Sequence, residues 1–300
     1  MKAAAAALVL AALLAPAARG AEQEGLAGVA AQSNGQPIHI TADNGIEWQQ
    51  DNRVYIARGN ASATRGDDTV TADTLTAYYR PTPATAAAQQ MPAKSGTDQP
   101  LGGGPTEIYR LEADGHVTFT TPTQTLVGDH AVYDLDQAVL VATGTGLRLT
   151  TPRDIITARV SMEWYDHQQI GVARGDAVAV SADRRVRADV LTAHVVKGDN
   201  GASRISRIDA NGNVIESSPG QIGRGDDGVY DLDTGIATLT GHVRLTRGEN
   251  ELRGRYAVVD LNTNVSRILS VPPGTTVSGN PSRVVGLIVP RTKQEPQKTQ

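Results

Sequence analysis

The chain has 300 residues, no cysteine, and 28 basic against 32 acidic residues, which gives a net charge of −4. Without disulfides, an exported protein of this sequence depends on its core and its backbone hydrogen bonds for stability. A mildly acidic chain lacks the basic surface that nucleic-acid binding usually needs, which argues against that class of partner. Only 4% of the residues are aromatic, so small and aliphatic side chains must fill the interior.

The first twenty residues have the pattern of a signal peptide. Lys2 supplies a positive charge, Ala3–Ala15 is apolar, and Ala18 and Gly20 place small residues at a cleavage site. The apolar run is too short to span a bilayer. We therefore expect residues 1–20 to be removed and the mature chain to be soluble in an extracytoplasmic compartment.

From Pro37 onward, apolar and polar residues alternate, as in Ile38, Ile40 and Ala42. This period of two is typical of half-buried β-strands, and no stretch after the signal peptide has a convincing helical period. Tight turns rich in Asp, Asn and Gly divide the chain into roughly fourteen strands of about a dozen residues each. Short connections predict that successive strands pair antiparallel, so the protein is expected to be all-β.

A sequence repeat organises these strands. Tyr133–Thr150 reads YDLDQAVLVATGTGLRLT, and Tyr230–Thr246 reads YDLDTGIATLTGHVRLT, at an offset of 97 residues. Glycines between small or polar residues mark a shorter unit of about 30 residues, made of two strands. These glycines are Gly59, Gly115, Gly144, Gly175, Gly212 and Gly241.

An aspartate follows several of these glycines by 14 residues, at Asp73, Asp129 and Asp189. Around each aspartate the apolar residues change from one strand face to the other, which is the effect of a β-bulge. Glycine within a strand is the other common marker of a bend. We therefore expect nearly every strand to bend near its middle, so that the sheet forms an elongated trough with two walls.

Two segments do not fit the strand pattern. Pro81–Pro105 is rich in Pro, Ala and Gly and is predicted to be a disordered surface insertion, because its prolines cannot join a β-ladder. Residues 290–300 are predicted to be an unstructured tail. The folded part is therefore expected to comprise residues 37–80 and 106–278, either as one long trough or as two fused modules.

No residue pattern nominates an enzyme, a metal site or a cofactor. His116 and His242 follow bend glycines at a position that elsewhere holds Asn, Thr or Asp, so they are interpreted as polar bend residues. The sequence contains no nucleophile elbow, zinc-protease motif or phosphate loop. Arg-Gly-Asp occurs three times; Arg174–Asp176 overlaps a bend, whereas Arg65–Asp67 and Arg224–Asp226, with the acid pairs that follow them, are assigned to turns between strands.

Several short phrases in the chain resemble the OstA/LptA family of periplasmic lipopolysaccharide-export proteins. They are TADTLTAY (Thr71–Tyr78), EADGHVTF (Glu112–Phe119), VGDHAVYD (Val127–Asp134) and DANGNV (Asp209–Val214). Their number and order extend the resemblance over most of residues 37–277. The resemblance implies an open, V-shaped antiparallel β-jellyroll in the periplasm.

The resemblance also implies a function, that of a carrier which shields the acyl chains of lipid A in an apolar groove. Its expected partners are lipopolysaccharide, and inner- and outer-membrane export components of the same fold that join edge to edge by strand pairing, with self-association into a homo-oligomer. The family provides no catalytic motif, so groove residues are predicted from strand phase alone. These candidates are Leu111, Val117, Phe119, Leu126, Ile208, Val214, Leu239, Val243 and Leu245.

Two other functional classes stay open on the sequence. One is a structural or adhesive envelope protein with a packed core and no ligand. The other is a carbohydrate-active β-helix enzyme, which would need carboxylates clustered on one wall. The sequence also leaves open whether the chain is the main bridge component or a paralogue.

Overall fold

The computed structural model describes residues 38–82, 106–182, 184–197, 203–260, 262–263, 265–274 and 283–289. Every regular element in these ranges is a β-strand, and the eighteen strands form one sheet. The predicted all-β fold is confirmed. The predicted signal peptide, most of the 81–105 insertion and the 290–300 tail lie outside the described residues.

The strands follow one another along the chain with these bounds: β1 His39–Thr41, β2 Ile46–Gln49, β3 Val54–Arg65, β4 Asp68–Pro81, β5 Thr106–Thr120, β6 Thr125–Asp134, β7 Val139–Thr143, β8 Arg148–Thr150, β9 Asp154–Thr157, β10 Ser161–Tyr165, β11 Ile170–Ser181, β12 Arg184–Lys197, β13 Ser203–Ser218, β14 Gln221–Asp231, β15 Ile236–Arg247, β16 Asn250–Asp260, β17 Val265–Leu269 and β18 Val285–Leu287. Two bounds differ from expectation. Pro81 pairs with Thr106 at the end of the β4–β5 ladder, and β18 lies beyond residue 278.

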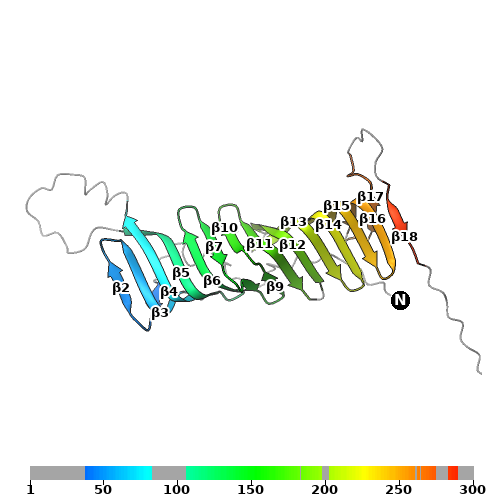
Figure 1. Cartoon of the computed structure of the whole chain (residues 1–300). Helices are drawn as coiled ribbons and strands as arrows, with labels where there is room; N and C mark the ends of the chain where they lie inside the picture. The colour runs from blue at the N-terminus through cyan, green and yellow to red at the C-terminus, as the bar shows by residue number, and fades with distance from the viewer. Residues whose placement is uncertain are drawn as a thin grey trace, which may run out of the picture.

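All strand pairs are antiparallel and join adjacent positions along the sheet, so the sheet is long and narrow (Figure 1). Ten strands are continuous. The other eight strands are short and share four positions in the sheet, two strands to each position. In these positions β1 and β2 both pair with β3, β7 and β8 with β6, β9 and β10 with β11, and β17 and β18 with β16. The eighteen strands therefore occupy fourteen positions in the sheet.

The long strands bend near their middle, at the glycines and the aspartates that mark the bends in the sequence. In β5 the register shifts between Asp114 and Val117, where Gly115 and His116 both have positive φ (76° and 50°). Gly-Asn or Gly-Asp pairs adopt the same conformation in β3, β11 and β13. Asn, Asp and His tolerate left-handed backbone better than most residues, which explains why the residue after the glycine is polar.

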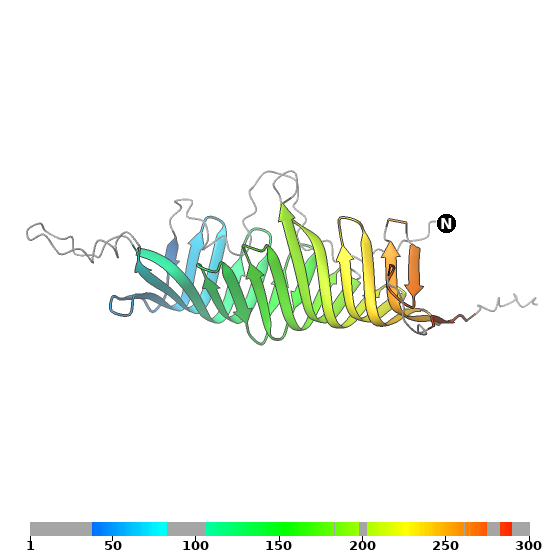
Figure 2. The ribbon, with the colours of Figure 1, turned by 90° about the horizontal axis from the view of Figure 1, so that it is seen from above.

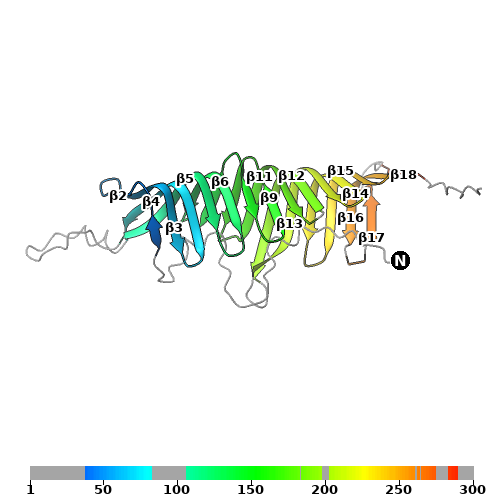
Figure 3. The same cartoon turned by 90° about the horizontal axis from the view of Figure 1, so that it is seen from below.

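The bend divides the sheet into two walls that face each other, as Figures 2 and 3 show from opposite sides. Wall 1 comprises β2, β7, β10, β17 and the halves of the long strands that pair with them. Wall 2 comprises β1, β8, β9, β18 and the other halves. We call the space between the walls the trough.

One sequence assignment is wrong. Arg224–Asp226 and the acid pair Asp226-Asp227 lie within β14, at its bend, where the register shifts between Arg224 and Asp227. Asp226 follows Gly212 by 14 residues, so it belongs to the series of bend aspartates. Arg65–Asp67 does end a strand, and Arg174–Asp176 does lie at a bend.

Candidate functional site

Cross-strand registers arrange the inward-facing side chains in rows along the trough. On wall 2, one row is apolar from end to end except at Glu216. Its members, in order, are Ile40, Ala63, Val70, Phe119, Leu126, Leu149, Ile156, Ala179, Val186, Glu216, Gly223, Leu245 and Leu252.

Wall 1 carries a corresponding row that contains five aromatic residues, whereas the wall 2 row contains one, Phe119. Its members are Trp48, Tyr55, Ala77, Leu111, Tyr133, Leu140, Trp164, Gly171, Ala193, Ile208, Tyr230, Ala237 and Val259. The repeated tyrosines Tyr133 and Tyr230 therefore hold equivalent positions, one in each half of the trough.

All nine predicted groove residues face the interior. Leu111 is half-buried, and the other eight are buried. Four of them, Leu111, Val117, Phe119 and Leu126, line a cavity in the N-terminal half. Another four, Ile208, Val214, Leu239 and Leu245, line a second cavity in the C-terminal half, whereas Val243 is packed tightly with 1% exposure.

The larger cavity, which we call the N-terminal hollow, has a volume of about 140 Å³ and an almost wholly apolar lining. Its walls include Ile40, Ala57, Val70, Leu111, Phe119 and Tyr133. Ile46 and Trp48 remain about half exposed on β2, the strand at this end of the sheet. The size is close to that of an engineered cavity of about 150 Å³ that binds benzene, so the hollow has room for part of an acyl chain.

Near the middle of the sheet lies a group of large buried side chains, Leu147, Met162 and Trp164, which we call the central plug. Leu147 is 2% exposed, and Met162 and Trp164 are buried. Leu147 lies over Gly128, where an added Cβ would be 3.1 Å from its Cδ2 atom, and the Trp164 ring lies over Gly171. The two glycines make room for the large side chains of the plug.

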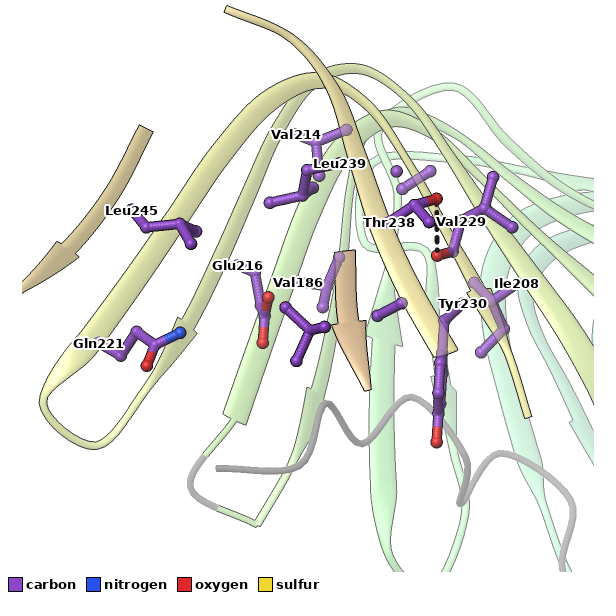
Figure 4. A pocket seen from close by; sticks show the side chains of 14 residues that line it. Val186, Ile208, Val214, Glu216, Gln221, Val229, Tyr230, Thr238, Leu239 and Leu245 are labelled. Carbon is purple, nitrogen blue, oxygen red and sulfur yellow. Dashed lines mark hydrogen bonds between the residues drawn. The ribbon is translucent and has the colours of Figure 1, made fainter. Parts of the chain in front are cut away.

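The second cavity, the C-terminal cavity, is much smaller, at about 40 Å³. Figure 4 shows the strands arching over it, with Glu216 between Val186 and Gln221 on one side and Tyr230 opposite. The apolar surroundings raise the pKa of the Glu216 carboxyl to about 7, although the positive charge of Arg184 acts in the other direction. Glu216 is therefore a titratable group within an apolar row.

The hydroxyl group of Tyr133 is a second polar feature inside the trough. Tyr133 lines the N-terminal hollow and is 6% exposed. No residue in the described part of the chain forms a hydrogen bond with its Oη atom. Burial, together with the carboxylates of Asp166 and Asp134, raises the pKa of Tyr133 to about 12, so the hydroxyl keeps its proton.

The outer surface of the bend carries polar pairs that hold neighbouring strands together. His116 Nδ1 lies 2.9 Å from Asp73 Oδ2, and Asn213 Nδ2 donates to Asp189 Oδ2 at 2.8 Å. The sequence predicted the bend but not these pairs, because they join residues 24 to 43 positions apart. His116 and His242 thus have hydrogen-bond partners at the bend. No cluster of three metal-ligating side chains occurs among the described residues.

His116 is expected to titrate above its ordinary pKa, because its hydrogen bond and ion pair with Asp73 favour the protonated ring. The pair adds stability below the unfolded-state pKa of His and loses it as the pH rises through the raised value. A histidine NMR titration should show the pKa of His116 falling in Asp73→Asn but not in Asp67→Asn, which changes a carboxylate in the β3–β4 turn. An unchanged pKa in Asp73→Asn would contradict the pairing.

Strand phase identified the apolar lining but missed Tyr133, Glu216 and the central plug. Tyr133 lies two residues after the inward-facing Ala131, and Glu216 lies two residues after the inward-facing Val214. Because every second residue of a strand faces the same side, the alternation could have identified both. Leu147 lies between two strand segments, where the alternation of strand residues gives no guide.

Within the described ranges, no helix is long and apolar enough to cross a membrane.

A search of the curated proteins finds no match. Among solved structures, the chain is similar to that of LptH, described as the LptA-homologous periplasmic component of the lipopolysaccharide transport device of Pseudomonas aeruginosa. That similarity has 18% sequence identity and a TM-score of 0.38, over 46% of this chain and 95% of the other.

A family model described as the LptA/LptD N-terminal domain of lipopolysaccharide transport proteins matches twice, over residues 39–160 and 156–265. The two matches adjoin near β9 and β10, beside the central plug, and together they span most of the chain. The chain therefore belongs to the LptA/LptD N-terminal domain family of lipopolysaccharide transport proteins.

Proposed function

We propose that the protein is a periplasmic carrier that shields the acyl chains of lipid A between the two walls while lipopolysaccharide moves to the outer membrane. The observation that carries this proposal is the N-terminal hollow, an apolar cavity of about 140 Å³ within a trough lined by apolar rows. Transfer of hydrocarbon out of water yields about 0.8 kcal/mol per CH₂ group. A single acyl chain of about a dozen carbons therefore has ample driving force to enter the trough.

The two ends of the sheet support a role as one link in a bridge. In the described part of the chain, β1 and β2 pair only with β3, and β17 and β18 pair only with β16. Large apolar side chains are exposed at both ends, including Ile46 at 53% and Leu287 at 62%. Open strand edges recruit further strands, so both ends suit edge-to-edge pairing with export components of the same fold or with a second copy.

Photo-crosslinking tests the carrier role most directly. A photoreactive residue at Val117, which is 3% exposed and faces the hollow, is expected to form an adduct with purified lipopolysaccharide. The same residue at the adjacent Thr118, which points to the opposite face of β5, is the matched control and should form none.

Adducts from both positions in equal yield would indicate surface adsorption and would contradict the proposal. Absence of adducts from Val117 in a correctly folded protein would favour the alternative, a structural envelope protein with a packed core. Far-UV circular dichroism of each variant establishes that the fold is intact.

A further inference from the structure

The starting observation is the buried hydroxyl of Tyr133. A buried polar group without a partner lowers stability, so natural proteins rarely keep one without a reason. Tyr133 is 6% exposed, and no described residue forms a hydrogen bond with its Oη atom. The hollow that it lines is otherwise almost entirely apolar, so the hydroxyl is well placed to serve a ligand.

The position of Tyr133 in the wall 1 row defines what it would meet. Leu111 precedes it on β5, Leu140 follows it on β7, and Trp164 of the central plug comes next on β10. Tyr133 therefore lies near the inner end of the hollow, where Leu140 and Ala142 of β7 complete the lining. An acyl chain that enters from the exposed end at β1 and β2 passes along the lining of the hollow to reach Tyr133.

Tyr230 provides an internal comparison. It occupies the equivalent repeat position and is similarly buried, at 9%, but it lines the C-terminal cavity of about 40 Å³. That volume holds little more than a water molecule or two, so it cannot accept an acyl chain without rearrangement. Tyr133 thus lies beside a cavity that has room for part of an acyl chain, whereas Tyr230 lies beside one that does not.

We propose that the N-terminal hollow is the acyl-binding compartment of the trough, and that the Tyr133 hydroxyl donates a hydrogen bond to the ester or amide carbonyl oxygen of an acyl group held there. This inference rests on the proposed carrier function and adds a residue that distinguishes acyl linkages from plain hydrocarbon. A buried hydroxyl that donates to a carbonyl recovers the hydrogen bond lost to water on folding.

Two detergents with C12 chains and disaccharide heads serve as probes. Sucrose monolaurate carries an ester carbonyl, whereas dodecyl maltoside carries an ether-type linkage without one. Binding below the critical micelle concentration would be measured by calorimetry on the full mature chain. Wild type is expected to bind the ester about five- to tenfold more tightly, the effect of one hydrogen bond in an apolar site.

Tyr133→Phe removes the hydroxyl and keeps the ring, so it is expected to abolish the preference for the ester while binding of dodecyl maltoside stays unchanged. Tyr230→Phe is the matched control and should retain the wild-type preference. An equal preference in wild type and Tyr133→Phe would overturn the inference, as would loss of the preference in Tyr230→Phe alone.

The outcome separates this inference from the carrier function. If Val117 forms lipopolysaccharide adducts and Tyr133→Phe behaves like wild type, only the role of Tyr133 is wrong. If neither detergent binds and Val117 forms no adduct, both proposals are overturned.

Discussion

Replacing Gly212 with alanine is expected to destabilise the β13–β14 region by about 2–5 kcal/mol, against about 1–2 kcal/mol for the same change at Gly220. The two glycines have nearly equal φ values, 77° and 78°, so both alanines incur the same left-handed strain. They differ in their surroundings. A Cβ at Gly212 would lie 2.3 Å from Asp189 Oδ2 and 3.0 Å from its Cβ, whereas a Cβ at Gly220 meets nothing within 4 Å.

Asp189 cannot avoid the new methyl group by rotating its carboxylate alone, because its Cβ and Cγ atoms are also too close. Moving it would break the hydrogen bond from Asn213. Hydrogen exchange of the β13 and β14 amides measures the loss. In an Asp189→Ala background, Gly212→Ala should cost markedly less; equal costs in both backgrounds, or equal effects at Gly212 and Gly220, would show that steric contact at the bend is unimportant.

Glu216→Gln is expected to remove a pH dependence of stability of about 3 kcal/mol between pH 4.5 and 7. The folded-state pKa of Glu216 is about 7, against an ordinary value of 4.5. The native state therefore binds more protons than the unfolded state across this interval, so the free energy of unfolding of wild type falls as the pH rises. Above pH 7 the full cost of burying the carboxylate is present.

Urea denaturation at a series of pH values measures this effect, with Glu216→Gln and wild type compared at each pH. The variant should match wild type near pH 4 and be more stable near pH 8. Arg184→Met provides a second test, because loss of the positive charge should raise the pKa of Glu216. The pH range over which the stability falls should then extend to higher pH. Parallel profiles for wild type and Glu216→Gln would show that the carboxylate is not buried in solution.

Much of the fold could be predicted because bends leave local marks in the sequence. A glycine followed by Asn, Asp or His signals two consecutive residues with positive φ, as at Gly115 and His116. The aspartate 14 residues later lies opposite that glycine in the hairpin, and its side chain packs against the next bend glycine, as Asp73 does against Gly115. Asp226 was misassigned because its Arg-Gly-Asp-Asp context resembles a turn, and only the register of β14 places it at a bend.

The division of the trough could not be predicted, since it depends on which side chains meet across the two walls. Strand phase gives the inward face but not the volume left between facing residues. Tyr133 and Tyr230 share the YDLD motif, yet one lies beside a cavity of about 140 Å³ and the other beside about 40 Å³. The two cavities are lined by different side chains, and no motif shared by the repeats specifies the space between them.

Every strand pairs only with strands at the adjacent positions of the sheet, and this has a consequence for how such a protein can change in length. Each two-strand unit adds about 10 Å to the sheet, because adjacent strands are about 4.8 Å apart. Insertion or deletion of a whole unit leaves every other register intact, since no strand has to close the sheet on itself. The number of units is therefore a parameter that gene duplication can adjust to the distance that the protein has to cover.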